Sequence, residues 1–337
     1  MSTPLTAEIA HHLAARARWR PAEIAFWLIA LASVIALPGW HLLLTQVAIL
    51  GLFALSLDLI LGFAGIISLG HAAFFGFGAY VAGILAARGL VAEPMLALVI
   101  SGVAAALLGW ATSFLVLRGS DLTRLMVTLG LALVLYEIAN RLVWLTGGAD
   151  GLSGFAMAPV LGWFDFDIAG HVGYAYSLAV TFVLFLLARR LIFSPFGLSL
   201  RSLKENALRA AAIGIPPRRR LVAIYAVAAG YAGVAGALLA QTTQFASLAT
   251  LDFERSADVL LALIIGGAGY LYGGLIGAVA FKLMQEWISG VTPQYWGFWL
   301  GLVLVLIVLV GRAPLQYVRA FLPRSHLASA ALRSGRG

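Results

Sequence analysis

The sequence predicts an all-α polytopic membrane protein with about 8–10 transmembrane helices, some of them broken or re-entrant at glycine-rich segments. Composition is the first observation behind this prediction. The 337 residues are 62% hydrophobic and 11% charged, whereas soluble globular domains are about 45–50% apolar and about 25% charged. The second observation is that apolar runs of about 20 residues, the length that crosses a bilayer as a helix, recur along the whole chain.

The predicted membrane spans follow one another through short connections. We place them at residues 22–38, 41–61, 65–87, 95–117, 122–145, 171–191, 219–242 and 294–311. The region 256–290 holds two further apolar arms around the stretch "GGAGYLYGG". Its first arm, residues 258–265, is too short to cross a bilayer comfortably, so we expect a re-entrant or broken-helix hairpin there. Glu8 and Glu23 in the long leader favour an uncleaved first span over a signal peptide.

The basic residues predict the orientation of the chain. Sixteen of the 22 Lys and Arg residues lie within residues 16–20, 189–220 and 312–337, and such clusters are typical of cytoplasmic segments. We therefore expect a cytoplasmic N-terminal tail over residues 1–20, a transmembrane domain over 21–311 and a basic cytoplasmic tail over 312–337. The loop 146–170 carries three Asp and no Lys or Arg, so we place it outside. This distribution explains the net charge of +8 without a nucleic-acid partner.

Motifs for chemistry within the chain are missing from the sequence. There is no cysteine, which excludes disulfides and thiolate nucleophiles. The phosphate-binding pattern G-x-x-x-x-G-K-[ST], the zinc pattern H-E-x-x-H and the nucleophile pattern G-x-S-x-G are also missing. We therefore predict that the chain is not an enzyme and binds no metal or cofactor itself.

The stretch "GFAGIISLGHAAFFGFGAYVAG", residues 62–83, is apolar enough for a membrane but contains six glycines. Because glycine costs a helix roughly 1 kcal/mol per residue, its first half favours a break that lines a pathway. Polar groups at membrane depth usually face such a pathway or an internal hydrogen-bond partner, and His71 is as well suited to bonding freed backbone as to touching a substrate. The candidate pathway residues are Asp58, Gly62, Gly65, Ser68, Gly70, His71, Gly266, Gly267 and Gly269.

Residues 199–213 read as one short helix on the basic side. An apolar stripe recurs there at helical spacing, Gly214 ends the helix, and Pro216 and Pro217 prevent its continuation. Such a helix either lies on the lipid surface or docks into a partner's groove, and its small, Ala-rich face favours a groove. The stripe comprises Leu200, Leu203, Ala207, Ala210 and Ala211.

Four segments resemble motifs of one family in the expected order. The stretch 62–83 is similar to the glycine-rich signature of branched-chain amino acid permeases of ABC importers, the LivH/LivM family. "LTGGADGLSG" resembles that family's outward loop, and "IIGGAGYLYGGLIGA" resembles its second glycine-rich hairpin, with Tyr270 and Gly274 in place of the usual Ser and Pro. "ENALRAAAIG" partly matches the EAA coupling motif, with Leu208 and Arg209 where that motif has Glu-Ala. The extra N-terminal span resembles the LivM-like subunit.

The resemblance implies an ABC importer permease fold and a role in moving Leu, Ile and Val across the bacterial inner membrane by alternating access. It implies a LivH-like permease partner, two separate ABC ATPase subunits that bind ATP, and an extracytoplasmic substrate-binding protein. That binding protein is expected to set most of the specificity. The implied ATPase-coupling residues are Leu203, Glu205, Ala207, Ala210, Ala211 and Gly214.

Other functions stay open from the sequence. Asp58 stands where relatives usually have Asn, and the family includes permeases for urea, short amides and aromatic acids. A proton-coupled secondary transporter would use Asp58, Glu137 or Asp258. For Glu137 an intrahelical pair with Arg141, four residues later, is the favoured interpretation. An intramembrane enzyme would need His71 and Asp58 to act together.

Overall fold

The computed structural model describes Trp19 and residues 21–167, 169–291, 297–299, 301, 302 and 305. The chain divides into two units, Met1–Leu283 and Met284–Gly337. In the second unit the described residues are the last part of one helix and short helical pieces around Phe298 and Trp299, whose rings pack edge to face. All further description concerns the first unit.

Every regular element in the described part of the first unit is a helix, and the extended pairing there consists of isolated bridges, such as Leu152 with Ala246. The all-α prediction is therefore confirmed. The long helices are α2 (Pro21–Ala36), α3 (His41–Leu61), α4 (Ala72–Ala87), α5 (Pro94–Val116), α6 (Asp121–Arg141), α8 (His171–Ile192), α11 (Pro217–Thr243), α12 (Phe253–Gly266) and α13 (Leu271–Val291). The short helices are η1 (Pro38–Trp40), α7 (Val143–Thr146), η2 (Gly148–Asp150), α9 (Pro195–Glu205), α10 (Ala207–Ala212) and η3 (Leu248–Thr250).

The helices agree with the predicted spans at most boundaries. By length and composition, five described helices are able to cross a membrane, or six if the bent pair of α12 and α13 counts as one span; α2 and α4 are shorter apolar helices. The pair bends by 112°, so the predicted break in the region 256–290 is present. One boundary differs: the predicted span 65–87 is helical only from Ala72, because residues 62–71 are irregular. The predicted span 294–311 lies largely outside the described residues.

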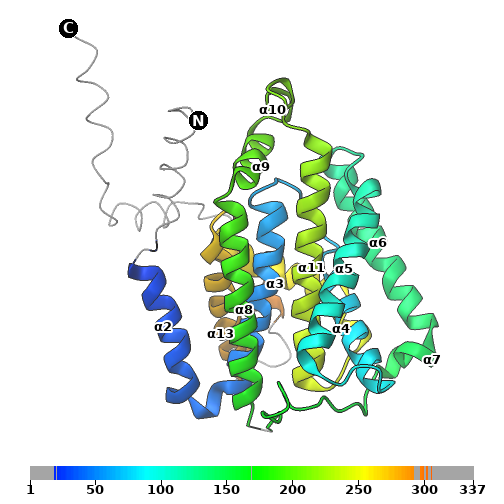
Figure 1. Cartoon of the computed structure of the whole chain (residues 1–337), viewed down its shortest axis with the longest axis vertical. Coiled ribbons are helices and arrows are strands. Elements are labelled where there is room, and N and C mark those ends of the chain that lie inside the picture. The colour runs from blue at the N-terminus through cyan, green and yellow to red at the C-terminus, as the bar shows by residue number, and fades with distance from the viewer. Residues whose placement is uncertain are drawn as a thin grey trace, which may run out of the picture. The chain divides into compact units, whose positions relative to one another are not determined.

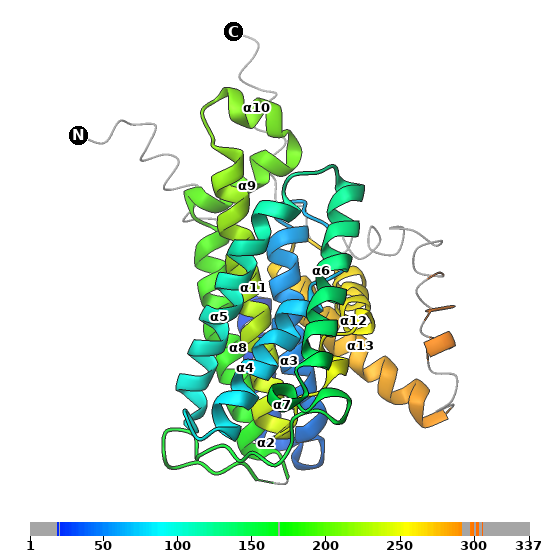
Figure 2. The same cartoon turned by 90° about the vertical axis from the view of Figure 1, so that its right-hand side faces the viewer.

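Helices α3 and α11 form the centre of the unit, with α4 and α5 packed against α11 (Figures 1 and 2). Glycine lets these backbones approach closely, as is typical where lipid leaves no hydrophobic force between helices. A Cβ added at Gly236 of α11 would overlap the carbonyl of Phe75, and one at Gly78 of α4 would overlap the backbone of Gly233. The core is therefore built on small residues at helix crossings.

The outer helices bury less of their surface. Only 17% of the apolar window of α6 and 33% of that of α5 is buried, against 78% for α3 and for α11. Glu137 and Arg141 form the predicted pair on α6, with the Arg141 Nε 2.6 Å from Glu137 Oε1, and both side chains are exposed. Helices α5 and α6 thus expose a broad apolar surface.

Candidate functional site

The first glycine-rich break follows α3 directly. The amide of Gly62 donates to the carbonyl of Asp58 and the amide of Ile66 donates to that of Ile60, which closes the end of the helix. Gly65 adopts a left-handed backbone at φ 72°, a conformation that glycine reaches without strain. The chain then runs without helix to Ala72, so the predicted interruption of this span is confirmed.

Asp58 joins the two glycine-rich breaks. Its buried Oδ1 accepts a 2.6 Å hydrogen bond from the amide of Gly269, which lies between α12 and α13. A Cβ added at Gly62 would overlap both this carboxylate and the Gly269 amide. Gly267 and Gly269 are both left-handed, which permits the tight turn that brings the amide to Asp58. The contact supports an internal hydrogen-bonding role for Asp58 and places the two breaks side by side.

Helix α9 contacts the same region at the end of α3. The Nζ of Lys204, at the end of α9, donates a 2.6 Å hydrogen bond to the carbonyl of Gly62. Its aliphatic stem lies against Gly65, where an added Cβ would come within 3.1 Å of the Lys204 Cγ. A cation near the end of a helix also interacts favourably with the free carbonyls there. Lys204 therefore connects α9 directly to the end of α3, a contact that the sequence-based prediction did not include.

Ser68, Gly70 and His71 are packed inside the protein. The Nε2 of His71 lies 2.9 Å from the Oγ of Ser56, and its ring stacks on Phe53 with centroids 5.6 Å apart. A Cβ on Gly70 would overlap the carbonyl of Thr128 on α6. All three are buried, so the structure brings them against neighbouring helices.

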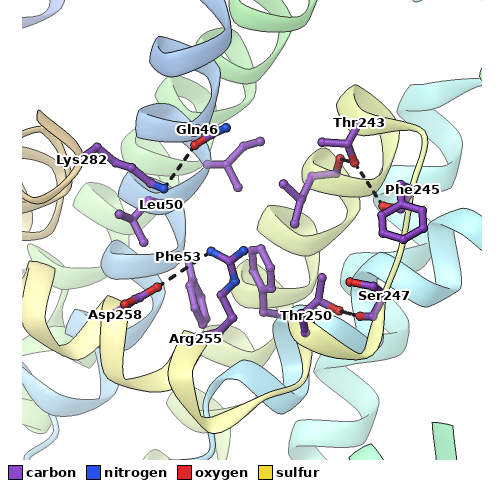
Figure 3. A pocket seen from close by; sticks show the side chains of 14 residues that line it. Gln46, Leu50, Phe53, Thr243, Phe245, Ser247, Thr250, Arg255, Asp258 and Lys282 are labelled. Atoms are coloured by element: carbon purple, nitrogen blue, oxygen red, sulfur yellow. Dashed lines mark hydrogen bonds and ion pairs between the residues drawn. The ribbon is translucent and has the colours of Figure 1, made fainter. Parts of the chain in front are cut away.

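A cavity of about 340 Å³ lies beside this region, between α3, α11, α12 and α13 (Figure 3). Three charged side chains, Arg255, Asp258 and Lys282, converge on one side of it, near Leu50 and Phe53. The remaining lining residues are Gln46, Ile49, Phe75, Leu239, Thr243, Phe245, Ser247, Ala249 and Thr250. The predicted pathway residues do not line this cavity; they adjoin it through the stacking of His71 on Phe53.

The charged groups of the cavity are loosely paired. The guanidinium of Arg255 lies 3.9 Å from the Oδ2 of Asp258, beyond hydrogen-bonding distance. The Asp258 side chain is 13% exposed and that of Arg255 is 43% exposed. The Nζ of Lys282 donates to Gln46 Oε1 at 3.2 Å. The sequence predicts that Asp258 is a charge at membrane depth. Arg255, three residues before it on the same helix face, is a further signal in the sequence for this charged site.

The prediction of one helix over residues 199–213 is wrong. Two helices, α9 and α10, meet at Asn206, whose backbone is extended at φ −157° and whose side chain accepts from the amide of Arg209 at 2.9 Å. Asn favours such a capping position over a helix interior because its amide competes for backbone groups. Gly214 ends α10 with φ 89°, as expected.

The apolar stripe predicted for this segment is divided between the inside and the outside. Leu200, Leu203 and Ala210 are buried, whereas Ala207, Ala211 and Glu205 are exposed. The exposed apolar side chains of the segment are instead Leu208, at 86%, and Ile213, at 71%. Large apolar groups at this exposure mark a surface for a partner when they cluster. The exposed apolar side chains of this segment therefore lie on α10 and on the residue that follows it.

The described helices make the chain a polytopic all-α membrane protein, in which two glycine-rich breaks meet at Asp58 beside a cavity lined by charged side chains. The chain belongs to the family described as "Branched-chain amino acid transport system / permease component", whose sequence profile matches residues 41–309. It is 27% identical over 280 residues to the high-affinity branched-chain amino acid transport system permease protein LivM of Escherichia coli K12, over 77% of this chain and 65% of that protein.

A second relative carries the same description. The LivM protein of Salmonella typhimurium LT2 is 27% identical over 289 residues, which cover 79% of this chain and 67% of the relative. The chain thus spans about two thirds of the length of these relatives. No solved structure matches the chain.

Proposed function

We propose that this chain is a LivM-like permease subunit of an ABC importer that moves branched-chain amino acids across the bacterial inner membrane by alternating access. Separate subunits bind and hydrolyse ATP, and an extracytoplasmic binding protein delivers the substrate. The family match and the transport role described for the two LivM relatives support the substrate class. The positive-inside rule supports cytoplasmic termini and a cytoplasmic position for residues 189–220.

The helix pair α9–α10 carries the proposal. It combines two exposed apolar side chains, Leu208 and Ile213, with an internal anchor, the hydrogen bond from Lys204 to Gly62. An ATPase that binds these side chains would move α9 together with the end of α3. Because Asp58 on α3 holds Gly269, the same motion reaches the break between α12 and α13. In secondary transporters, alternating access is largely the rocking of one helix bundle against another around a fixed site, and we propose the same kind of motion for this permease.

The outward loop supports delivery of substrate to the cavity. The loop 146–170 pairs with the segment after α11 through two hydrogen bonds between Leu152 and Ala246, at 2.7 and 3.0 Å. Phe245 and Ser247, on either side of Ala246, line the cavity. A binding protein seated on this loop would therefore release substrate next to the cavity. The weakly buried surface of α5 and α6 is the place we assign to the LivH-like partner or to lipid.

The test is co-purification from the host in mild detergent. We expect two ATPase subunits to accompany the chain, and we expect Leu208→Asp to lose them because it places a charge in the docking face. Leu90→Asp is the matched control, since Leu90 is also an exposed leucine, at 68%, and follows α4. Retention of the ATPases by Leu208→Asp would refute the docking assignment. Absence of any ATPase, together with uptake that collapses with a protonophore, would favour a proton-coupled transporter instead.

A further inference from the structure

The cavity between α3, α11 and α12 contains opposite charges next to an apolar wall. We propose that it is a selectivity site that recognises the two charges of a zwitterionic α-amino acid, with Arg255 binding the carboxylate and Asp258 binding the ammonium group. The proposal rests on the importer function above and extends it, because selection would then occur in the permease as well as in the binding protein.

The geometry of the ion pair is the first argument. At 3.9 Å, Arg255 and Asp258 attract each other without forming a hydrogen bond. The guanidinium has five N–H donors, and the carboxylate has two acceptor oxygens. A zwitterion between them would give each group a charge-assisted hydrogen bond that they do not give one another. The pair is therefore arranged to exchange its partner for a ligand of both charges.

The burial of Asp258 is the second argument. Its side chain is 13% exposed, so a ligand that displaced Arg255 without supplying a cation would remove one of the two cations, Arg255 and Lys282, that attract this largely buried carboxylate. A largely buried charged group that loses a partner costs more free energy than a hydrogen bond to that group contributes. Sites with such groups therefore reject analogues that cannot replace the lost partner. Urea and short amides have no ionised groups, and aromatic acids without an amino group lack the cation. The site thus favours amino acids over the other substrates of the family.

The apolar wall and the volume are the third argument. The apolar lining consists of Ile49, Leu50 and Phe53 of α3, Phe75 of α4 and Leu239 of α11. This wall suits an aliphatic side chain, since burying apolar surface is favourable and non-directional. A volume of about 340 Å³ is at the small end of ligand cavities, which suits one amino acid. Lys282, held by Gln46, adds a second cation to the same space and strengthens attraction for a carboxylate.

The test measures ligand binding to the intact chain in lipid nanodiscs by saturation-transfer difference NMR, which detects weak binding. The probes are leucine, 4-methylpentanoate, which lacks the ammonium group, 3-methylbutylamine, which lacks the carboxylate, and urea. We expect leucine to bind at least about tenfold more tightly than the three others, the ratio that follows from one charge-assisted hydrogen bond.

Variants assign each charge. Arg255→Gln should weaken leucine binding about tenfold and make leucine bind no more tightly than 3-methylbutylamine. Arg255→Lys should retain part of the affinity for leucine. Asp258→Asn should remove the advantage of leucine over 4-methylpentanoate. Arg141→Gln is the matched control, because Arg141 belongs to an exposed pair on α6 away from the cavity. Each variant is first shown to unfold at the wild-type temperature, so that loss of binding is not loss of fold.

The outcomes separate this proposal from the importer function. Leucine binding that Arg255→Gln and Asp258→Asn leave within about twofold of wild type overturns the selectivity site, even if the assembled importer transports leucine. Equal binding of urea and leucine overturns it as well. Charge-dependent leucine binding without ATP-driven uptake supports the site and refutes the importer function alone.

Discussion

Lys204 offers the sharpest perturbation of the proposed coupling. Its Nζ donates to Gly62 at 2.6 Å, while its stem packs on Gly65, so Lys204→Met removes the hydrogen bond and keeps the apolar contact. A hydrogen bond with a charged donor contributes about 1.5–3 kcal/mol when shielded. Lys204 is an exposed residue, so water competes for its ammonium group. We therefore assign about 1 kcal/mol to the hydrogen bond between Lys204 and Gly62.

A free energy of about 1 kcal/mol changes the ratio of molecules with α9 bonded to the end of α3 to molecules without this bond about fivefold. The assay is the number of leucine molecules imported per ATP hydrolysed in proteoliposomes that contain the assembled importer. We expect Lys204→Met to hydrolyse ATP at close to the wild-type rate and to import less leucine per ATP, by a factor of up to about five. The loss arises because the ATPases still bind α10 but move the end of α3 less effectively.

Two matched variants control this experiment. Arg190→Met removes an exposed cation from α8, outside the proposed docking surface, and should leave the ratio unchanged. Lys204→Arg keeps a hydrogen-bond donor at the end of α9 and should retain part of the wild-type import per ATP. An unchanged import ratio for Lys204→Met, with normal assembly, would refute the idea that this contact transmits motion.

Three further predictions concern stability and the role of Asp58. Gly236→Ala should destabilise the chain by about 1–3 kcal/mol, measured as a lower unfolding temperature, because its methyl group would overlap the Phe75 carbonyl. Asp58→Asn, which keeps an acceptor for the Gly269 amide, should retain uptake, whereas Asp58→Ala should lose about 1–3 kcal/mol of stability; loss of uptake in Asp58→Asn alone would indicate a proton relay. Partial desolvation raises the pKa of Asp167, but amide N–H donors at the start of α8 lower it by more, so this pKa is lower in the folded state. The ionised Asp167 therefore stabilises the fold above the unfolded-state pKa, and this stabilisation is lost as the pH falls through the folded-state pKa. The unfolding temperature of wild type should then fall more steeply below about pH 4 than that of Asp167→Asn, and parallel curves would contradict this.

The break in the first glycine-rich stretch was predictable because its cause is local. Gly62, Gly65 and Gly70 weaken a helix wherever the sequence places them, and the structure is irregular from residue 62 to 71. The hairpin at 266–274 was predictable for the same reason. What the glycines face was not predictable, since the Thr128 carbonyl behind Gly70 belongs to a helix almost 60 residues away.

The contacts that define the candidate site depend on tertiary packing. Asp58 meets Gly269 across 211 residues, and Lys204 meets Gly62 across 142, separations at which a single sequence carries no pairing signal. The cavity draws on α3, α11, α12 and α13, so the sequence did not show that Lys282 lies near Arg255 and Asp258. The error at Asn206 was different in kind, because an Asn between two short helical runs is a recognisable capping residue.

Uptake of radiolabelled leucine by proteoliposomes tests the central claim most directly. The vesicles contain this chain, its second permease and the ATPases, with ATP inside and the substrate-binding protein outside. The proposed function predicts leucine accumulation that requires both ATP and the binding protein and that a protonophore leaves unchanged. Leucine uptake that persists without ATP and collapses with the protonophore, or transport of urea in place of leucine, would contradict it.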